Sequence, residues 1–193
     1  MGRYGRIALL GVAIVAVAPI TLGCGPAAPA APATPAPSVV RAPDADAGSA
    51  PAALHGRPLL TITGKIGATN DDGVLRGDQA ELDRFGLLAM SVDDPWAKQR
   101  VTLQGFWLRD LVSLARPDAA ATSLHLSALD DYQVDLSLAD VRSQSIFLAT
   151  RTADGTALPV EEGGPTRVVF SDDLAARFSP DLWIWNIETI EVR

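Results

Sequence analysis

The chain has 193 residues, of which 48% are hydrophobic and 20% are charged, and its 16 basic and 23 acidic residues give a net charge of −7. A disordered chain is poorer in hydrophobic residues and a polytopic membrane protein is richer, so the composition predicts one soluble, mildly acidic domain with appendages. The sequence pI of about 4.7 and the lack of a Lys/Arg cluster after the first residues disfavour nucleic-acid binding, and we expect no nucleic acid partner.

Residues 1–24 are typical of an export signal. Arg3 and Arg6 precede an apolar run over residues 7–22 that only Gly11, Pro19 and Thr21 interrupt. At about 1.5 Å per residue, a helix over this run would barely cross a hydrocarbon core of about 30 Å. A signal peptide is therefore favoured over a permanent membrane-spanning helix.

Cys24 is the only cysteine, which excludes an intramolecular disulfide and metal sites that need several thiolates. The segment Thr21-Leu22-Gly23-Cys24 resembles a bacterial lipobox, after which a Cys is acylated and becomes the new N-terminus. Gly23 fits that pattern, whereas Thr21 stands where the pattern prefers Leu. The resemblance implies a lipid anchor at Cys24 that holds the protein to a membrane in the cell envelope, on the extracytoplasmic face. The alternative is an ordinary signal peptide that is cleaved in the Ala-rich stretch beyond.

Residues 25–56 form an Ala/Pro-rich segment. Seven prolines between Gly25 and Ala53 fix φ and remove N–H donors, so neither helix nor sheet is expected to propagate there. We interpret the segment as a disordered, extended tether between an anchored Cys24 and a folded domain over residues 57–193. A disordered tail without a tethering role is the alternative.

The folded domain carries 13 basic and 21 acidic residues and alternates short strands with shorter helices. The spacing Asp78-x-x-Glu81 predicts a capping box that opens a helix and buries Leu82 and Phe85. Period-2 patterns predict strands and a 3.6-residue pattern predicts a helix that Pro117 stops. Strands are expected over residues 59–66, 87–92, 100–104, 123–129, 132–136, 146–152, 166–170 and 183–192, helices over 78–85, 108–114 and 138–142, and turns at 70–73, 130–131 and 154–155. This order predicts a β-rich α+β domain with a barrel-like or sandwich-like sheet core.

The sequence contains no clear motif for hydrolase catalysis or for metal binding. No Gly-x-Ser-x-Gly elbow is present, His55 lies at the linker boundary, and His125 alternates with leucines on a predicted strand. The four Asp-Asp pairs lie where turns or helix caps are expected and lack the alternating spacing of a calcium loop. We therefore expect no catalytic residue and no metal ligand.

Several residues are candidates for a binding site. Gly163-Gly164-Pro165 precedes a strand, and such a Gly pair lets backbone amides approach an anionic group. Trp183 and Trp185 share one face of their predicted strand, either in the core or as an aromatic wall of a cleft. The cations best placed near strand ends are Arg109, Arg151 and Arg167.

A series of short motifs runs through nearly the whole folded domain. In order they are Leu60-Thr-Ile-Thr-Gly-Lys-Ile66, Val101-Thr-Leu-Gln-Gly-Phe-Trp-Leu-Arg-Asp-Leu111, Ala128-Leu-Asp-Asp-Tyr-Gln-Val134, Phe147-Leu-Ala149, Asp154-Gly-Thr-Ala-Leu158, Gly164-Pro-Thr-Arg-Val-Val169 and Trp185-x-Ile-x-x-Ile-x-Val192. This series resembles the oxidoreductase molybdopterin-binding domain of the sulfite oxidase superfamily. The resemblance implies a mixed, β-rich sulfite-oxidase-like fold with a cleft that holds a molybdenum pterin cofactor in the enzymes.

The chain departs from that family at the cofactor-binding positions. In the enzymes a Cys thiolate ligates molybdenum between a strand like Val101–Gln104 and the Gly-x-x-Leu-Arg helix, but here the strand continues directly into Gly105. Neighbouring Ser or Asp side chains do not replace a soft thiolate ligand. Family members also carry a His before the Gly-x-Pro-x-Arg strand and a Lys beside the late Trp, where this chain has Glu162 and Asp181-Leu182. The positive charge that a pterin phosphate requires is therefore missing.

These observations lead to three hypotheses. The first is a non-catalytic envelope lipoprotein without a cofactor, which binds a small ligand or an envelope protein partner in a remnant cleft lined by Tyr132, Arg167, Trp185, Gly164 and Arg109. The second is an oxidoreductase that retains molybdopterin and passes electrons to a periplasmic partner. The third is a purely structural envelope module.

Overall fold

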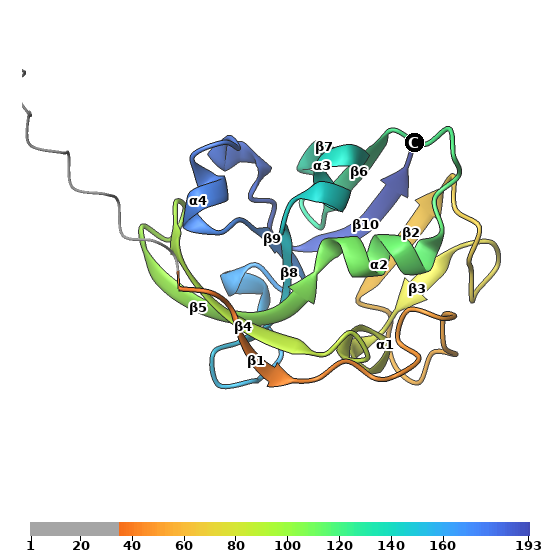
Figure 1. Ribbon diagram of the computed structural model, residues 1–193, viewed down its shortest axis with the longest axis horizontal. Coiled ribbons are helices and arrows are strands. Elements are labelled where there is room, and N and C mark those ends of the chain that lie inside the picture. The colour runs from red at the N-terminus through yellow and green to blue at the C-terminus, as the bar shows by residue number, and fades with distance from the viewer. Residues whose placement is uncertain (1–34) are drawn as a thin grey trace, which may run out of the picture. The chain divides into compact units, whose positions relative to one another are not determined.

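Two five-stranded β-sheets form the framework of residues 35–193, which are the residues that the computed structural model describes (Figure 1). The predicted signal peptide and Cys24 lie outside the described residues. The strands are β1 Ser38–Arg41, β2 Leu60–Gly64, β3 Leu75–Gly77, β4 Leu87–Asp94, β5 Gln99–Trp107, β6 Ser123–Ala128, β7 Gln133–Ser137, β8 Phe147–Thr152, β9 Arg167–Val169 and β10 Ile187–Val192. The helices are α1 Gln79–Asp83, α2 Leu108–Ala115, α3 Leu138–Ser143 and α4 Asp172–Ala175, with 3-10 turns η1 Val160–Glu162 and η2 Pro180–Leu182.

The first sheet has the strand order β1-β4-β5-β8-β9, and all of its neighbouring strands are antiparallel. Its longest pairing joins β4 to β5 over seven residue pairs, from Leu88↔Gly105 to Asp94↔Gln99. The second sheet has the order β3-β2-β10-β6-β7, in which β10 runs parallel to β2 and antiparallel to β6. The last strand of the chain therefore lies at the centre of the second sheet.

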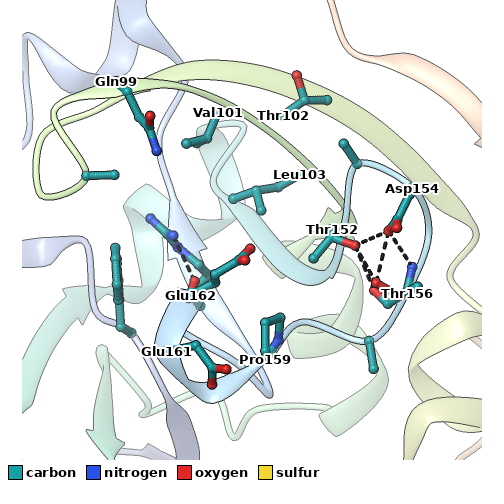
Figure 2. Close-up of a pocket in the computed structure, with 15 residues that line it drawn as sticks. Gln99, Val101, Thr102, Leu103, Thr152, Asp154, Thr156, Pro159, Glu161 and Glu162 are labelled. Carbon is teal, nitrogen blue, oxygen red and sulfur yellow. Dashed lines mark hydrogen bonds between the residues drawn. The ribbon is translucent and has the colours of Figure 1, made fainter.

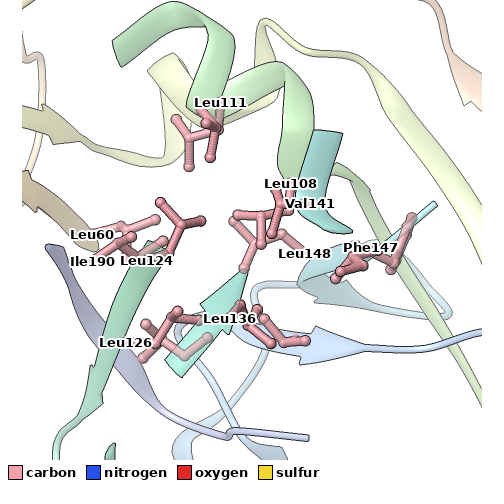
Figure 3. Close-up of a cluster of buried hydrophobic side chains, with 14 of the residues drawn as sticks. Leu60, Leu108, Leu111, Leu124, Leu126, Leu136, Val141, Phe147, Leu148 and Ile190 are labelled. Carbon is pink, nitrogen blue, oxygen red and sulfur yellow. The ribbon is translucent and has the colours of Figure 1, made fainter. Parts of the chain in front are cut away.

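Helix α2 packs its apolar face against both sheets. Its buried residues follow the predicted helical spacing and include Leu108, Leu111 and Val112. Strand β7 alternates buried and exposed residues and β6 alternates buried and half-buried ones, so each contributes one face to the same core. Figure 3 shows the leucines of α2 above side chains from β2, β6, β7 and β10, with Phe147 and Leu148 of β8 beside them. The predicted β-rich α+β class with short helices is confirmed.

Asp78 caps α1 as predicted and also ties down the chain that precedes β2. The reciprocal half of the capping box does not form, because the Glu81 carboxylate accepts from the Ala52 N–H and from Arg84. The Asp78 carboxylate accepts the Glu81 N–H at 2.9 Å and the N–H groups of His55 and Gly56 at 2.6 and 2.7 Å. Burial raises the pKa of Asp78, but these three backbone donors outweigh it and hold the pKa below its ordinary value. The carboxylate is therefore bound as an anion to the backbone of both segments.

The prediction that no regular structure forms before Arg57 is wrong for part of that segment. Residues Ser38–Arg41 form β1, which pairs with the outer edge of β4, and Ala47 is buried in the core. The five residues between Pro37 and Pro43 carry the N–H groups that the surrounding prolines lack, so an edge strand can form there. The first sheet thus contains a strand that the proline-rich composition did not predict.

The strand predicted over residues 183–192 begins only at Ile187. Trp183 follows η2, and Asn186 has a left-handed backbone with φ 54°, which breaks the extended conformation before β10. Trp183 and Trp185 therefore belong to an irregular segment and not to one face of a strand.

The helices of residues 35–193 are all too short or too polar to span a membrane.

Candidate functional site

A cleft of about 790 Å³ lies between β5 and the chain that connects β8 to β9. Figure 2 shows Gln99, Val101, Thr102 and Leu103 along one side and the segment from Thr152 to Glu162 along the other. Arg167 and Trp185 complete the wall, and we call this cavity the Arg167 cleft. Its full lining is Ala97, Gln99, Val101, Thr102, Leu103, Thr152, Ala153, Asp154, Thr156, Ala157, Pro159, Glu161, Glu162, Arg167 and Trp185.

A buried ion pair between Arg167 and Asp94 stands at the base of this cleft. Both residues are only 2% exposed, and Arg167 Nη2 donates to Asp94 Oδ2. The other oxygen of Asp94 accepts the N–H groups of Trp96 and Ala97, each at 2.9 Å, which fixes the turn between β4 and β5. Arg167 Nη1 donates to the Glu162 carbonyl at 3.1 Å. The pair therefore joins three segments that are distant in the sequence.

The Trp185 ring stacks on this arginine. The Arg167 guanidinium carbon lies 4.2 Å from the centroid of the indole, within the range of a cation–π interaction. Gly163 supports both side chains, since a Cβ there would meet Trp185 at 2.9 Å and Arg167 Cδ at 3.0 Å. Gly163 also has φ 93°, a conformation that favours glycine. Close packing therefore holds the arginine and the indole together.

Two N–H groups of this cluster lack a hydrogen-bond partner. Among the described residues, the buried side-chain polar atoms without a partner are Thr150 Oγ1, Arg167 Nε and Trp185 Nε1, and the last two belong to residues that line the cleft. A buried donor without a partner costs about 1–3 kcal/mol unless a ligand or water satisfies it. Burial also lowers the pKa of the Arg167 guanidinium, although Asp94 and then Glu162 act in the opposite direction.

The charge of the Arg167 cleft is acidic overall. Asp154, Glu161 and Glu162 line it, while the one cation in its lining, Arg167, is already neutralised by Asp94. Asp154 accepts from the Thr152 hydroxyl and from the N–H and hydroxyl of Thr156, and these bonds lower the pKa of its carboxyl group. Three carboxylates with no free arginine disfavour an anionic ligand.

A second cavity of about 390 Å³ shares Trp185 with the first. Aromatic side chains dominate its lining, and we call it the aromatic cleft. It is lined by Trp96, Asp130, Tyr132, Asp181, Trp183, Trp185 and Asn186. Trp185 is therefore the wall between a polar cleft and an aromatic one.

The residues predicted to line one binding site do not all lie in one cleft. Arg167 and Trp185 lie together in the Arg167 cleft, and Tyr132 joins Trp185 in the aromatic cleft. Arg109 lies in the first turn of α2, with its guanidinium 5.5 Å from the Trp107 ring and 3.9 Å from Asp110, and it lines neither cleft.

Gly164 has a packing role and does not offer its N–H to a ligand. That N–H donates to the Pro159 carbonyl at 2.8 Å, and a Cβ at this position would lie 1.8 Å from the Leu158 carbonyl oxygen. The proposed approach of an anionic group to the Gly163-Gly164 backbone therefore has no free donor at Gly164. Close contact between chain segments explains why glycine is required there.

Sequence reasoning missed Asp94 and Trp96. The Asp93-Asp94 pair predicts a turn, and Asp94 does accept two turn N–H groups, but its second oxygen binds an arginine 73 residues away. Trp96 follows it and is 53% exposed on the aromatic cleft. A tryptophan directly after an Asp-Asp-Pro turn pattern was the signal available in the sequence for both.

The strand segment before α2 has no place for an additional loop or ligand. Gly105 pairs with Ala149 of β8, and a Cβ on Gly105 would lie 2.0 Å from the Leu148 carbonyl oxygen. β5 then leads into α2 without an intervening residue. Within residues 35–193, no group of three or more His, Cys, Asp or Glu side chains is placed to hold a metal ion.

Comparisons with known proteins agree on the family and the fold. The family model for the oxidoreductase molybdopterin binding domain matches residues 81–192. A solved structure, the sulfane dehydrogenase SoxCD from Paracoccus pantotrophus, is similar with a TM-score of 0.54 and 16% identity, over 72% of this chain and 40% of that chain. The chain thus spans less than half of that protein, and the likeness shows the fold alone. No curated protein matches. The resemblance that the motif order indicated is confirmed.

Replacing Gly163 with Ala should destabilise the protein more than the matched change at Gly155. Both glycines have positive φ, 93° and 86°, but an alanine at 155 would meet only ordinary contacts, the nearest at 3.8 Å. Gly163→Ala adds overpacking against Trp185 and Arg167, so we expect its free energy of unfolding to fall by about 1–3 kcal/mol more than that of Gly155→Ala, measured by urea denaturation. Equal losses would contradict the close packing at Gly163.

Proposed function

This chain belongs to the oxidoreductase molybdopterin-binding domain family, and we propose that it is a non-catalytic member whose clefts bind a ligand or a partner in place of the molybdenum cofactor. The observation that carries the proposal is the state of Arg167, whose charge is committed to the buried Asp94. The fold supplies a site, and the chemistry of that site decides its function.

The donor set does not fit the molybdenum cofactor. The resemblance places the thiolate ligand between Val101–Gln104 and α2, where β5 runs against β8 at Gly105 and passes directly into the helix. None of the described residues is a cysteine, and Cys24 precedes them. Hard carboxylate and hydroxyl oxygens from Asp154, Thr152 and Thr156 line the cleft in its place, and such oxygens favour other metals than a thiolate does.

The electrostatics of the Arg167 cleft also disfavour a pterin phosphate. A phosphate is best held by arginine or lysine side chains that are free to donate paired hydrogen bonds. Arg167 already uses Nη1 and Nη2 on Glu162 and Asp94, which leaves Nε as its unpartnered nitrogen. Glu161 and Glu162 add negative charge at the same wall. The cleft is therefore suited to a neutral or cationic group that accepts one or two hydrogen bonds.

The protein purified from its native host, grown with sufficient molybdenum, should contain neither the metal nor the pterin. Elemental analysis by mass spectrometry and pterin fluorescence after oxidative release measure both, and we expect well under about 0.1 equivalent of each, because the donor set lacks the thiolate. A family member that contains the ligating Cys, purified in parallel, is the positive control. Stoichiometric metal or pterin would instead support the oxidoreductase alternative.

We propose further that the protein is an envelope lipoprotein. The support comes from the sequence alone: a charged and then apolar leader, a lipobox-like Thr21-Leu22-Gly23-Cys24, and an Ala/Pro-rich segment before β1. An anchored domain of this kind would meet a small ligand or an envelope protein partner outside the cytoplasm.

The full chain should partition into the detergent phase of a Triton X-114 extraction and incorporate labelled palmitate, whereas Cys24→Ser should do neither. Acyl chains contribute about 0.8 kcal/mol per buried methylene, so their loss removes the membrane affinity. Thr21→Leu, which completes the lipobox pattern, is the control that should retain both properties. Palmitate incorporation by the Cys24→Ser variant would contradict the anchor.

A further inference from the structure

The aromatic cleft presents exposed rings that the core does not require. Trp96 is 53% exposed and Tyr132 is 44% exposed, and both line the cleft together with Trp183 and Trp185. These are two of the six large hydrophobic residues that are exposed in the described part of the chain. Large aromatic rings held at the surface beside a cavity indicate a binding site.

Hydrogen bonds fix both exposed rings in place before any ligand binds. The Trp96 indole N–H donates to the Pro180 carbonyl at 3.2 Å, and the Tyr132 hydroxyl donates to the Asp181 carbonyl at 2.9 Å. Both acceptors belong to η2, so the polar atoms of the rings are used within the protein. The rings therefore offer their faces and edges to a ligand at little additional ordering cost.

The carboxylate and amide groups of the cleft offer acceptor atoms. The Asp130 carboxylate accepts the Tyr132 N–H at 3.2 Å, and the Asp181 carboxylate contacts the Ser179 hydroxyl at 3.2 Å. Neither carboxylate takes part in an ion pair within residues 35–193. The Asn186 amide N–H groups donate to Val160 and Gly164, which leaves its side-chain oxygen as an acceptor. No Lys or Arg is among the residues that line this cleft.

We propose that the aromatic cleft binds a guanidinium group, an inference that rests on the proposed function of the domain as a binding module. A guanidinium is planar, stacks on aromatic faces and carries five N–H donors that match carboxylate oxygens. The cleft supplies the complementary set, which consists of aromatic rings, two carboxylates without a cationic partner and an amide oxygen. A ligand that carries an anion instead would meet two negative charges without a compensating cation.

The protein already uses this pairing within its own fold. The guanidinium of Arg167 stacks on Trp185 at 4.2 Å, and that of Arg109 lies 5.5 Å from the Trp107 ring. The Trp185 indole N–H is buried without a partner at the wall of the same cleft. A ligand that joins a guanidinium to a carbonyl or carboxylate oxygen, as arginine does, supplies an acceptor for this donor. The guanidinium belongs either to a free small molecule or to an arginine of a partner protein.

Isothermal titration of the full-length protein with arginine and with citrulline tests the proposal. Citrulline has the same shape but an uncharged side chain, so we expect it to bind at least about tenfold more weakly than arginine. A second pair of probes, acetyl-Gly-Arg-Gly-amide and its citrulline counterpart, distinguishes the two sources. Tighter binding of the peptide assigns the site to a partner protein, and tighter binding of free arginine assigns it to a small molecule.

Variants of the lining residues locate the binding. Asp181→Asn and Asp130→Asn should each weaken arginine binding about three- to tenfold, and Trp96→Phe about two- to fivefold, because each removes part of the charge or of the indole face. Asp131→Asn is the matched control, since Asp131 lies in the same turn with φ 64°, which Asn tolerates, and does not line the cleft. It should leave binding unchanged, and thermal unfolding should show that all four variants are folded.

Equal binding of arginine and citrulline, no binding of any guanidinium probe, or an equal loss in Asp131→Asn would each overturn the inference. None of these results bears on molybdenum content. A protein that contains no molybdenum and binds no guanidinium would keep the proposed binding function and lose only this assignment of the ligand. A protein that contains molybdenum would lose the proposed function whatever its affinity for arginine.

Discussion

The buried ion pair between Arg167 and Asp94 is the contact on which both the Arg167 cleft and the aromatic cleft depend. Asp94 ends β4 and Arg167 begins β9, and β5 and β8 lie between these strands in the sheet. At about 4.8 Å per strand, a flat sheet would hold them at least about 14 Å apart, so the pair requires the sheet to curl. Through Glu162, Trp96 and Trp185 the same pair positions η1, the turn between β4 and β5, and the segment that precedes β10.

The arrangement of the two clefts follows from this constraint. Trp185 is held on one side by the Arg167 guanidinium and Gly163, and it contributes to the lining of both cavities. The family fold is retained, with two sheets around α2. The cation at the centre of the site now serves the structure, because losing its partner would leave a buried, uncompensated charge that costs about 3–5 kcal/mol. This commitment of Arg167 is what supports the proposed binding role on a shared fold.

Local sequence patterns predicted most of the helices and strands, because interactions between residues close in the sequence determine where these elements form. The Asp78 cap of α1, the apolar face of α2 and the alternation in β6 each depend on contacts within a few residues. β1 was missed because its pairing with β4 outweighs the proline content around it. The final strand was predicted too long because Asn186 takes a left-handed backbone that the alternating pattern does not reveal.

The site was only partly predictable for the same reason. Arg167 and Trp185 could be named from a family motif, but the partner of Arg167 lies 73 residues away in a pair of aspartates that resembles a turn. Tyr132 was placed beside them, whereas the structure assigns it to the neighbouring aromatic cleft. A single sequence shows which residues can carry charge. It does not show which of those charges the fold has already neutralised.

A double-mutant cycle on Asp94→Asn and Arg167→Met, measured as free energies of unfolding in urea, tests the central claim most directly. If Arg167 is committed to Asp94, the two changes are strongly coupled, and the double variant should be more stable than the sum of the single effects predicts by about 2–3 kcal/mol. Additive effects, with a coupling below about 0.5 kcal/mol, would show that the arginine is not committed to Asp94. The Arg167 charge would then be free to hold an anionic cofactor, and this result would contradict the claim that Asp94 neutralises Arg167.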